Sequence, residues 1–479
     1  IYNDGFIGDI TGDFIGNYSS YGGAIDNGGT IVDITGDFIG NYSSSYGGAI
    51  SNNWGTIGNI TGDFIGNYAY SDSENGKAQG GAIYNYNKGT ITIAGASTFT
   101  DNYVEVKGKK TSNAIHNNGG YGGAIINFNS GNIVINDAIT GENSKSGSDI
   151  YKSIFNFAGQ QTATSDNDVI TLNNSLTNTS TDETLGNIEV NLTKGTLKLG
   201  HYKSEKFGDS HGTLGKGIDF NVSGNSTLSL ADDDIHSVHL GDMTLNSDLK
   251  FGMDVDLANN LTDTFTTDAL NDNSHKIILN HVNLTTENGR HISEFNIDNM
   301  SGLLKLDEDI KVTSGTKVNN TYLAEVINDN TIKFGNTKAL ETAVQFKKAD
   351  KNFNMTNTAE IEVDLGKLVG PELTINGNNN VINGNNKKGM ELAGDQTLNL
   401  NDVSVKGFEG TFAENNGIMN IAAGAGNELN LNSGISGSGD INAKGEGKLN
   451  INNDIAANKM TVSGGELNLK NGSELANVE

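Results

Sequence analysis

FIGNYSSYGGAI fills residues 14–25 of the chain, and FIGNYSSSYGGAI returns at residues 38–50 with one serine added. Two short motifs, F-x-x-N and G-G-A-I, follow each other in this order four times before residue 126. Repeats of about 20 to 50 residues are typical of solenoids, in which each repeat folds as one coil and stacks on its neighbours to bury its apolar side. The repetition therefore predicts a fold of stacked coils.

Each copy contains three short segments with strand character. Residues 34–38 (ITGDF) alternate apolar or small residues with polar ones, and residues 23–25 and 29–31 supply two further short strands. Asn27 and Gly28 stand between the last two, and both residue types tolerate the positive φ of a corner. Three strands and three corners in each coil predict an all-β fold, a right-handed parallel β-helix that forms a single elongated rod.

The repeated letters of the array have structural roles in this fold. The phenylalanines are expected to stack as an inward column, the asparagines to form an amide ladder at a corner, and the glycine pairs to turn where a Cβ would collide. Ile25, Ile50, Ile83 and Ile125 form a second predicted apolar column. The predicted scaffold residues are Phe14, Asn17, Gly22, Gly23, Phe38, Asn41, Gly47, Gly48, Phe64, Asn67, Gly80, Gly81, Phe99, Asn102, Gly122 and Gly123.

The chain grows at one joint of the coil. Between the Asn of F-x-x-N and the first Gly of G-G-A-I lie residues 18–21, 42–46, 68–79 and 103–121 in the successive copies. In a stack this joint recurs on one edge, and inserts on one face often mark a binding side. Surface loops that have no partner are the alternative. The candidate binding residues in the two long inserts are Ser71, Asp72, Glu74, Lys77, Glu105, Lys107, Lys109 and Lys110.

The rest of the chain divides by the regularity of its pattern. Residues 1–157 hold the regular coils, and residues 158–337 keep a strand rhythm without the motifs, which predicts looser coils. A helix-compatible run interrupts residues 338–371, as a short helix or a boundary. Regularity returns over residues 372–479, where Leu429, Leu449 and Leu467 recur about once per coil.

Composition excludes several classes of protein. A net charge of −27 and a single arginine, Arg290, argue against nucleic-acid binding, which needs clustered cations. No long apolar run is present, so direct membrane insertion is not expected. The absence of cysteine excludes disulfides and thiolate metal sites. The chain starts at Ile1 inside a repeat, which suggests a piece of a longer polypeptide.

The paired motifs F-x-x-N and GGA[I/L/V] resemble the repeat signature of the polymorphic membrane proteins, a family of autotransporter adhesins. The resemblance covers residues 1 to about 150, and residues 224–265 and 372–386 are similar in style to autotransporter passengers. The resemblance implies export across an outer membrane and a β-helix that adheres to cells or matrix. The implied location is the cell surface or the extracellular space, with anchoring through a segment outside this chain or with release.

Three chemical functions are alternatives to adhesion. FGDSHG (residues 207–212) is similar to the sequence around a serine-protease nucleophile, but His211 stands where a glycine is expected, so Ser210 is predicted to be a turn serine. Residues 232–234 (DDD) with His236 and His239 could bind a cation, although an Asp-rich turn is favoured. A polysaccharide-cleaving enzyme would need paired carboxylates that the sequence alone does not place.

The sequence therefore predicts a non-enzymatic adhesin or display scaffold without a cofactor, which binds a host or neighbouring-cell surface protein or glycan through loops on one edge. A structural surface filament or lattice protein, which self-associates, is the alternative.

Overall fold

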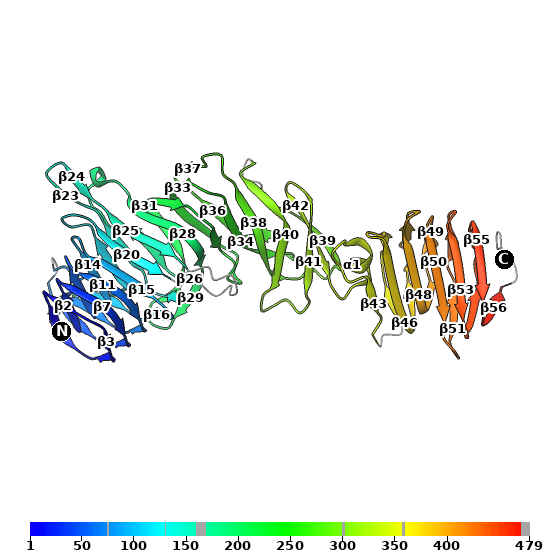
Figure 1. Ribbon diagram of the computed structural model, residues 1–479, viewed down its shortest axis with the longest axis horizontal. Coiled ribbons are helices and arrows are strands. Elements are labelled where there is room, and N and C mark those ends of the chain that lie inside the picture. The colour runs from blue at the N-terminus through cyan, green and yellow to red at the C-terminus, as the bar shows by residue number, and fades with distance from the viewer. Residues whose placement is uncertain (74–75, 130, 160–168, 299–301, 357–359, 471–479) are drawn as a thin grey trace. The chain divides into compact units, whose positions relative to one another are not determined.

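The computed structural model describes residues 1–73, 76–129, 131–159, 169–298, 302–356 and 360–470. It divides into two compact units (Figure 1). The N-terminal unit comprises residues 1–286 and 297–317, and the C-terminal unit comprises residues 287–296 and 318–479. Both units are built almost entirely from parallel strands that pair from one coil to the next, so the predicted parallel β-helix is confirmed.

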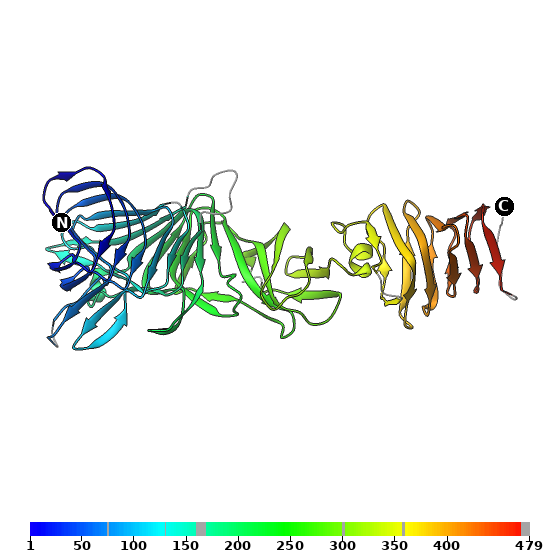
Figure 2. The same cartoon turned by 90° about the horizontal axis from the view of Figure 1, so that it is seen from below.

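Three stacks of parallel strands form the N-terminal unit, whose successive coils are visible in Figure 2. The first stack contains β1 (Tyr2–Asn3), β6 (Ile25–Asn27), β10 (Ile50–Asn53), β14 (Ile83–Tyr86), β19 (Ile115–Asn118), β22 (Ile139–Glu142) and β27 (Ser175–Asn178). The second contains β2 (Phe6–Ile7), β3 (Ile10–Thr11), β7 (Thr30–Thr35), β11 (Thr56–Thr61), β15 (Thr90–Ala94), β20 (Ala124–Asn129), β25 (Ser153–Ala158), β28 (Ile188–Leu199), β31 (Thr213–Val222), β33 (Ser237–Leu245) and β37 (Ala269–Asn271). The third contains β4 (Phe14–Ile15), β8 (Phe38–Ile39), β12 (Phe64–Ile65), β16 (Ser97–Thr100), β21 (Ile133–Ile135), β26 (Val169–Leu172), β32 (Ser226–Ser229), β34 (Leu249–Asp256), β38 (Ile277–Thr286) and β40 (Leu304–Ser314), with the second half of β28 between β26 and β32.

The repeated phenylalanines form the predicted inward column. Phe14, Phe38, Phe64 and Phe99 are in register, and their rings stack face to face with centroids 4.5–4.8 Å apart. The last three are fully buried. The spacing matches that between hydrogen-bonded strands, so one ring per coil keeps both the backbone ladder and the aromatic packing intact.

Two asparagine ladders run parallel to the core. Asn17, Asn41, Asn67 and Asn102 form the predicted one, in which each Nδ2 donates to the Oδ1 of the next copy at 2.9–3.0 Å. A second ladder at the other corner was not predicted, and its Nδ2 to Oδ1 distances are 2.7–2.8 Å. It consists of Asn3, Asn27, Asn52, Asn85 and Asn117. These ladders satisfy polar groups that face the interior.

The paired glycines stand where neighbouring coils approach most closely. A Cβ on Gly48 would lie 1.9 Å from the carbonyl oxygen of Gly81 in the next coil. Gly22, Gly47 and Gly80 have φ between 51° and 68°, which disfavours other residues. The first three glycine pairs therefore have the predicted role.

The C-terminal unit is a second, smaller β-helix. One wall consists of β43 (Asn352–Asn354), β44 (Glu360–Glu362), β46 (Glu372–Asn383), β48 (Thr397–Lys406), β50 (Ile418–Ala423), β53 (Asp440–Gly445) and β55 (Lys459–Ser463). The others consist of β51 (Glu428–Leu431), β54 (Lys448–Ile451) and β56 (Glu466–Leu469), and of β45 (Gly366–Lys367), β47 (Lys388–Leu392), β49 (Glu409–Asn415) and β52 (Gly434–Ser436). Leu429, Leu449 and Leu467 are in register, as their spacing predicts.

A short helix and an antiparallel sheet precede these coils. The helix α1 (Leu340–Gln345) lies within the helix-compatible run, and Leu340 and Val344 are buried in the core of the C-terminal unit. The sheet contains β39 (Ile292–Asn296), β42 (Thr331–Asn336) and β41 (Tyr322–Asn328). The division into four sequence segments stays a prediction, whereas the structure groups the chain into the two units above.

Candidate functional site

The variable joint forms a strand before it forms a loop. Residues that follow F-x-x-N build a separate outer sheet on the N-terminal unit, with the order β18-β17-β13-β9-β5. Its strands are β5 (Tyr18–Tyr21), β9 (Tyr42–Tyr46), β13 (Tyr68–Ser71), β17 (Tyr103–Val106) and β18 (Lys109–Ser112). The first four are parallel, and β18 folds back on β17 as a hairpin. The inserts therefore extend an ordered sheet on one side of the coils.

The register corrects the alignment of the fourth copy. Ile83 pairs with Ile115, which is fully buried, whereas Ile125 pairs with Thr90 in the second stack. The fourth equivalent of G-G-A-I is thus residues 112–115 (SNAI), and the insert ends before Ser112. Asn113 replaces the second glycine, and its Oδ1 accepts a hydrogen bond from Gly80 N–H at 3.1 Å.

The prediction that Gly122 and Gly123 belong to the glycine column is therefore wrong. Both have positive φ and lie in the turn that leads into β20, where Gly122 lies over Lys88 of the preceding coil. The chain needs left-handed backbone at this corner too, and the same residue type meets that need.

The predicted binding residues separate into two groups. Glu105, Lys109 and Lys110 lie on the β17–β18 hairpin, with Lys107 at its turn, and Lys110 Nζ is 3.8 Å from Glu105 Oε2. The residues around β13 are Ser71, at the strand's end, exposed Asp72, and Lys77. Glu74 lies outside the described residues. Of the candidates that the structure describes, Lys77 alone lines the cavity described below.

Stacked tyrosines cover the outer sheet. The rings of Tyr18, Tyr42, Tyr68 and Tyr103 follow one another with centroids 4.7–5.2 Å apart. Lys110 and Lys206 place their ammonium groups 4.7 and 3.9 Å from the centroid of Tyr103. This column ends in cation–π contacts.

A second aromatic column borders a groove between the outer sheet and the first stack. Tyr21 and Tyr46 lie on the outer sheet and Tyr84 on β14, with centroids 5.9 and 4.6 Å apart. His116 continues the column, nearly parallel to Tyr84 at 5.6 Å. The cavity measures about 460 Å³. Its lining residues are Tyr21, Asp26, Tyr46, Ser51, Asn53, Lys77, Gln79, Tyr84, Tyr86 and Asn118, and we call it the tyrosine groove.

Alternation along the strands places the floor of the groove. Asp26, Ser51 and Tyr84 occupy one register position in successive coils, and Asn53 and Tyr86 occupy the position two residues further on. Residues two apart on a strand face the same side of the sheet. The side chains at these two positions therefore face the groove, whereas the isoleucine one residue earlier on each strand points into the core. The groove floor is thus an ordered feature of the solenoid surface.

The groove combines neutral aromatic faces with charged groups. Burial raises the pKa of the phenols of Tyr46, Tyr84 and Tyr86, so these rings are neutral at physiological pH. Burial also raises the pKa of Asp26. At the far end of the column, the His116 side chain, whose Nε2 is 3.4 Å from Glu142 Oε2, lowers the pKa of Glu142 against the effect of its burial.

Sequence reasoning missed this groove because its parts come from different motifs. Tyr21 and Tyr46 precede glycine pairs, and that recurrence is visible in the sequence, but Tyr84 follows a G-G-A-I motif instead. Only the coil register brings these three rings together.

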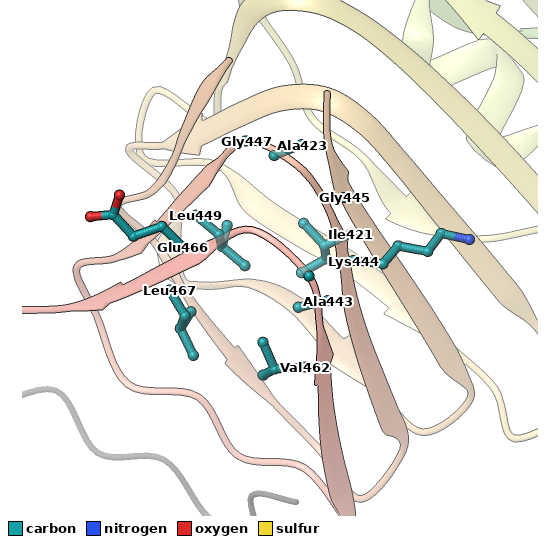
Figure 3. A pocket seen from close by; sticks show the side chains of 11 residues that line it. Ile421, Ala423, Ala443, Lys444, Gly445, Gly447, Leu449, Val462, Glu466 and Leu467 are labelled. Atoms are coloured by element: carbon teal, nitrogen blue, oxygen red, sulfur yellow. The ribbon is translucent and has the colours of Figure 1, made fainter. Parts of the chain in front are cut away.

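Two other candidates are a single serine and a small void. Ser210 lies in the strand formed by Gly208–His211 and not in a turn, so the prediction of a turn serine is wrong, and its hydroxyl donates a hydrogen bond to the carbonyl oxygen of Asn173 at 2.8 Å. A cavity near the last coils of the C-terminal unit measures about 10 Å³ and is enclosed by side chains such as Ile421, Leu449 and Leu467 (Figure 3). That volume is about what one water molecule needs, so a larger ligand does not fit there.

Comparison with protein-family models, curated proteins and solved structures found no match. Among the described residues, no helix is long and apolar enough to cross a membrane.

Proposed function

We propose that this chain is the β-helical passenger of an autotransporter-like surface protein, and that it acts as an adhesin whose tyrosine groove binds a saccharide of a cell surface or matrix. The tyrosine groove is the observation that carries the proposal. The F-x-x-N and G-G-A-I repeats support the adhesin class by resemblance, and they support surface display by the same route.

The chemistry of the groove favours a saccharide. A sugar ring has a C–H face, which packs on aromatic rings, and a rim of hydroxyls, which need hydrogen-bond partners. The rings of Tyr21, Tyr46 and Tyr86 can pack against the C–H face of a sugar, and Asp26 and Lys77 can form hydrogen bonds with its hydroxyls. Its volume of about 460 Å³ falls within the range of small-molecule sites.

Two tyrosines on the same strand provide a matched test. Tyr21 lines the groove and is 49% exposed, whereas Tyr18 on the same strand is 53% exposed and lies outside it. Each ring stacks on one tyrosine of the next coil. Tyr21→Ala therefore removes a groove contact, and Tyr18→Ala removes a comparable ring without changing the groove.

The assay measures the adhesion of beads coated with the whole chain to cultured epithelial cells and to immobilised matrix proteins. Loss of one contact between a tyrosine ring and a sugar, worth about 1 kcal/mol, weakens the affinity of each groove for its saccharide about fivefold. We expect Tyr21→Ala to reduce adhesion at least to that extent and Tyr18→Ala to leave it unchanged. Periodate oxidation of the cell-surface glycans should abolish adhesion. Equal adhesion of all three proteins, or adhesion resistant to periodate, would contradict the proposal.

The hairpin is tested separately. Replacement of residues 105–110 by Asn-Gly joins Val104 to Thr111, which are paired in register. Because the groove is lined by other residues, adhesion should survive this change. Its loss would move the contact surface to the hairpin.

A further inference from the structure

Three histidines from separate segments meet on the N-terminal unit. The hairpin formed by β29 (His201–Ser204) and β30 (Gly208–His211) pairs His201 with His211, and their rings stack with centroids 4.3 Å apart. The ring of His236, which lies just before β33, is 5.0 Å from that of His211. A local sequence motif does not predict that these three rings come together, because the hairpin and the turn belong to different coils.

Two carboxylates face these imidazoles. Asp234 Oδ2 is 3.8 Å from His201 Nδ1 and 4.0 Å from His211 Nε2, and Asp232 Oδ1 is 3.8 Å from His236 Nδ1. One ligand atom from each of His211, Asp232 and His236 lies within 4.8 Å of the others, and the same holds for His201, His211 and Asp234. We call these five residues the histidine cluster.

Buried ligand atoms in the cluster lack hydrogen-bond partners. The Asp232 side chain is 4% exposed and that of His236 is 10% exposed. Asp232 Oδ2, His236 Nε2 and His211 Nδ1 are buried and form no hydrogen bond. Folded proteins leave few buried polar atoms unpaired, and each such atom needs an explanation. Three of them in one cluster, on residue types that bind metals, point to a ligand.

The surrounding backbone holds the acidic turn in place. Asp254 Oδ2 accepts hydrogen bonds from the N–H groups of Asp232 and Asp233 at 2.8 and 2.9 Å. Asp263 Oδ1 accepts one from His236 N–H at 3.0 Å, and it is 3.6 Å from His236 Nδ1. His236 Nδ1 is also 2.9 Å from the backbone carbonyl oxygen of Asp234. A carbonyl or carboxylate oxygen beside one ring nitrogen orients the imidazole so that the other nitrogen can bind a metal. Here the other nitrogen is the unpaired Nε2.

We propose that the histidine cluster binds a first-row transition-metal dication of the Zn²⁺ type, with His211, His236 and Asp232 as its principal ligands. Imidazole and carboxylate together suit Zn²⁺, whereas Ca²⁺ prefers oxygen ligands alone. Ligand atoms around tetrahedral Zn²⁺ lie about 3.4 Å apart, so separations of up to 4.8 Å need to close by about 1.4 Å or less. The metal would tie the β29–β30 hairpin to the turn before β33, and this inference does not rest on the proposed adhesin function.

The test uses the whole chain without a histidine tag, stripped of metal with EDTA. Zn²⁺ binding is measured by calorimetry, and Co²⁺ supplies a d–d absorption spectrum that reports imidazole and carboxylate coordination. Three variants are compared: His211→Gln, His236→Gln and the control His239→Gln. His239 bonds to Thr266 and Asp268 outside the cluster, so its replacement removes a histidine without touching a proposed ligand.

We expect one tight Zn²⁺ equivalent for the unmodified chain and for His239→Gln, and a loss of at least tenfold in affinity for the two cluster variants. Co²⁺ should give a tetrahedral spectrum that Zn²⁺ abolishes. Absence of saturable binding by the unmodified chain, or an equal loss in all three variants, would overturn the proposal. Circular dichroism shows whether each variant keeps its strands. His201→Gln, on the partly exposed hairpin, provides a further variant should His236→Gln fail to fold.

Discussion

Asp137 offers the sharpest test of the energetics of the corner ladder. It follows Asn102 in the column, and its Oδ2 accepts hydrogen bonds from both N–H and Nδ2 of Asn102 at 2.9 Å. Its Oδ1 accepts one from the Ser112 hydroxyl at 3.2 Å. The residue is only 2% exposed. Burial raises the pKa of Asp137 to about 6, although these hydrogen bonds favour the ionised form.

The expected effect follows from this pKa. The pKa of folded Asp137 lies about two pH units above the ordinary aspartate value of 3.8, and each pH unit corresponds to about 1.4 kcal/mol, so ionised Asp137 lowers the free energy of unfolding by about 3 kcal/mol. The pKa of Asp137 is higher in the folded than in the unfolded chain. Its roughly 3 kcal/mol of stability is therefore fully present below about pH 4 and is lost as the pH rises through about 6. About half of the loss occurs between pH 5 and pH 8.

Asp137→Asn removes the charge and keeps the shape. The new amide oxygen can accept the two Asn102 bonds, and the amide nitrogen can donate to the Ser112 hydroxyl. The variant should therefore exceed the unmodified chain in stability by about 3 kcal/mol at pH 8 and by about half that at pH 5. Urea unfolding followed by the fluorescence of Trp54 measures this, because the single tryptophan reports on the N-terminal unit. Exposed Asp72→Asn is the control. A stability difference between Asp137→Asn and the unmodified chain that does not change with pH would refute the reasoning.

Three further tests, each by urea unfolding, concern the packing of the N-terminal coils. Ile115→Asp should destabilise the N-terminal unit by several kcal/mol because it buries a charge, whereas Ile125→Asp should cost much less. The opposite order would support the alignment in which the fourth G-G-A-I motif ends at Ile125. Gly48→Ala should prevent normal stacking, because its Cβ would collide with the next coil, while Gly8→Ala, with nothing within 4 Å, should be nearly neutral. Asn67→Ala should cost about 2 kcal/mol or more, since it leaves buried ladder groups unpaired; an effect below 0.5 kcal/mol would remove the ladder from the list of stabilising features.

Much of the fold could be predicted because the solenoid repeats its contacts. The stacking of Phe38 on Phe64 and the bond of Asn41 to Asn67 follow from any alignment that keeps the coil period. The predicted alignment of the fourth repeat was wrong because sequence identity and strand register disagree there. Residues 112–115 keep the buried strand with a different sequence, and identical glycines serve another corner.

The two candidate sites depend on contacts between coils that no single repeat encodes. The tyrosine groove combines rings from two motifs, and the histidine cluster joins a hairpin to a distant turn. The sequence suggested His236 and His239 together as possible cation ligands, but residues three apart along an extended chain point to opposite faces of the sheet. His239 accordingly bonds to Thr266 and Asp268, and the cluster takes His211 instead.

A glycan array probed with the whole chain tests the central claim, that the tyrosine groove binds a saccharide. The account predicts binding to a group of saccharides that share one structural element, with the signal lost in Tyr21→Ala and retained in Tyr18→Ala. An array on which no saccharide binds, while beads coated with the same protein still adhere to cells, would contradict the claim and assign adhesion to a protein partner at another surface.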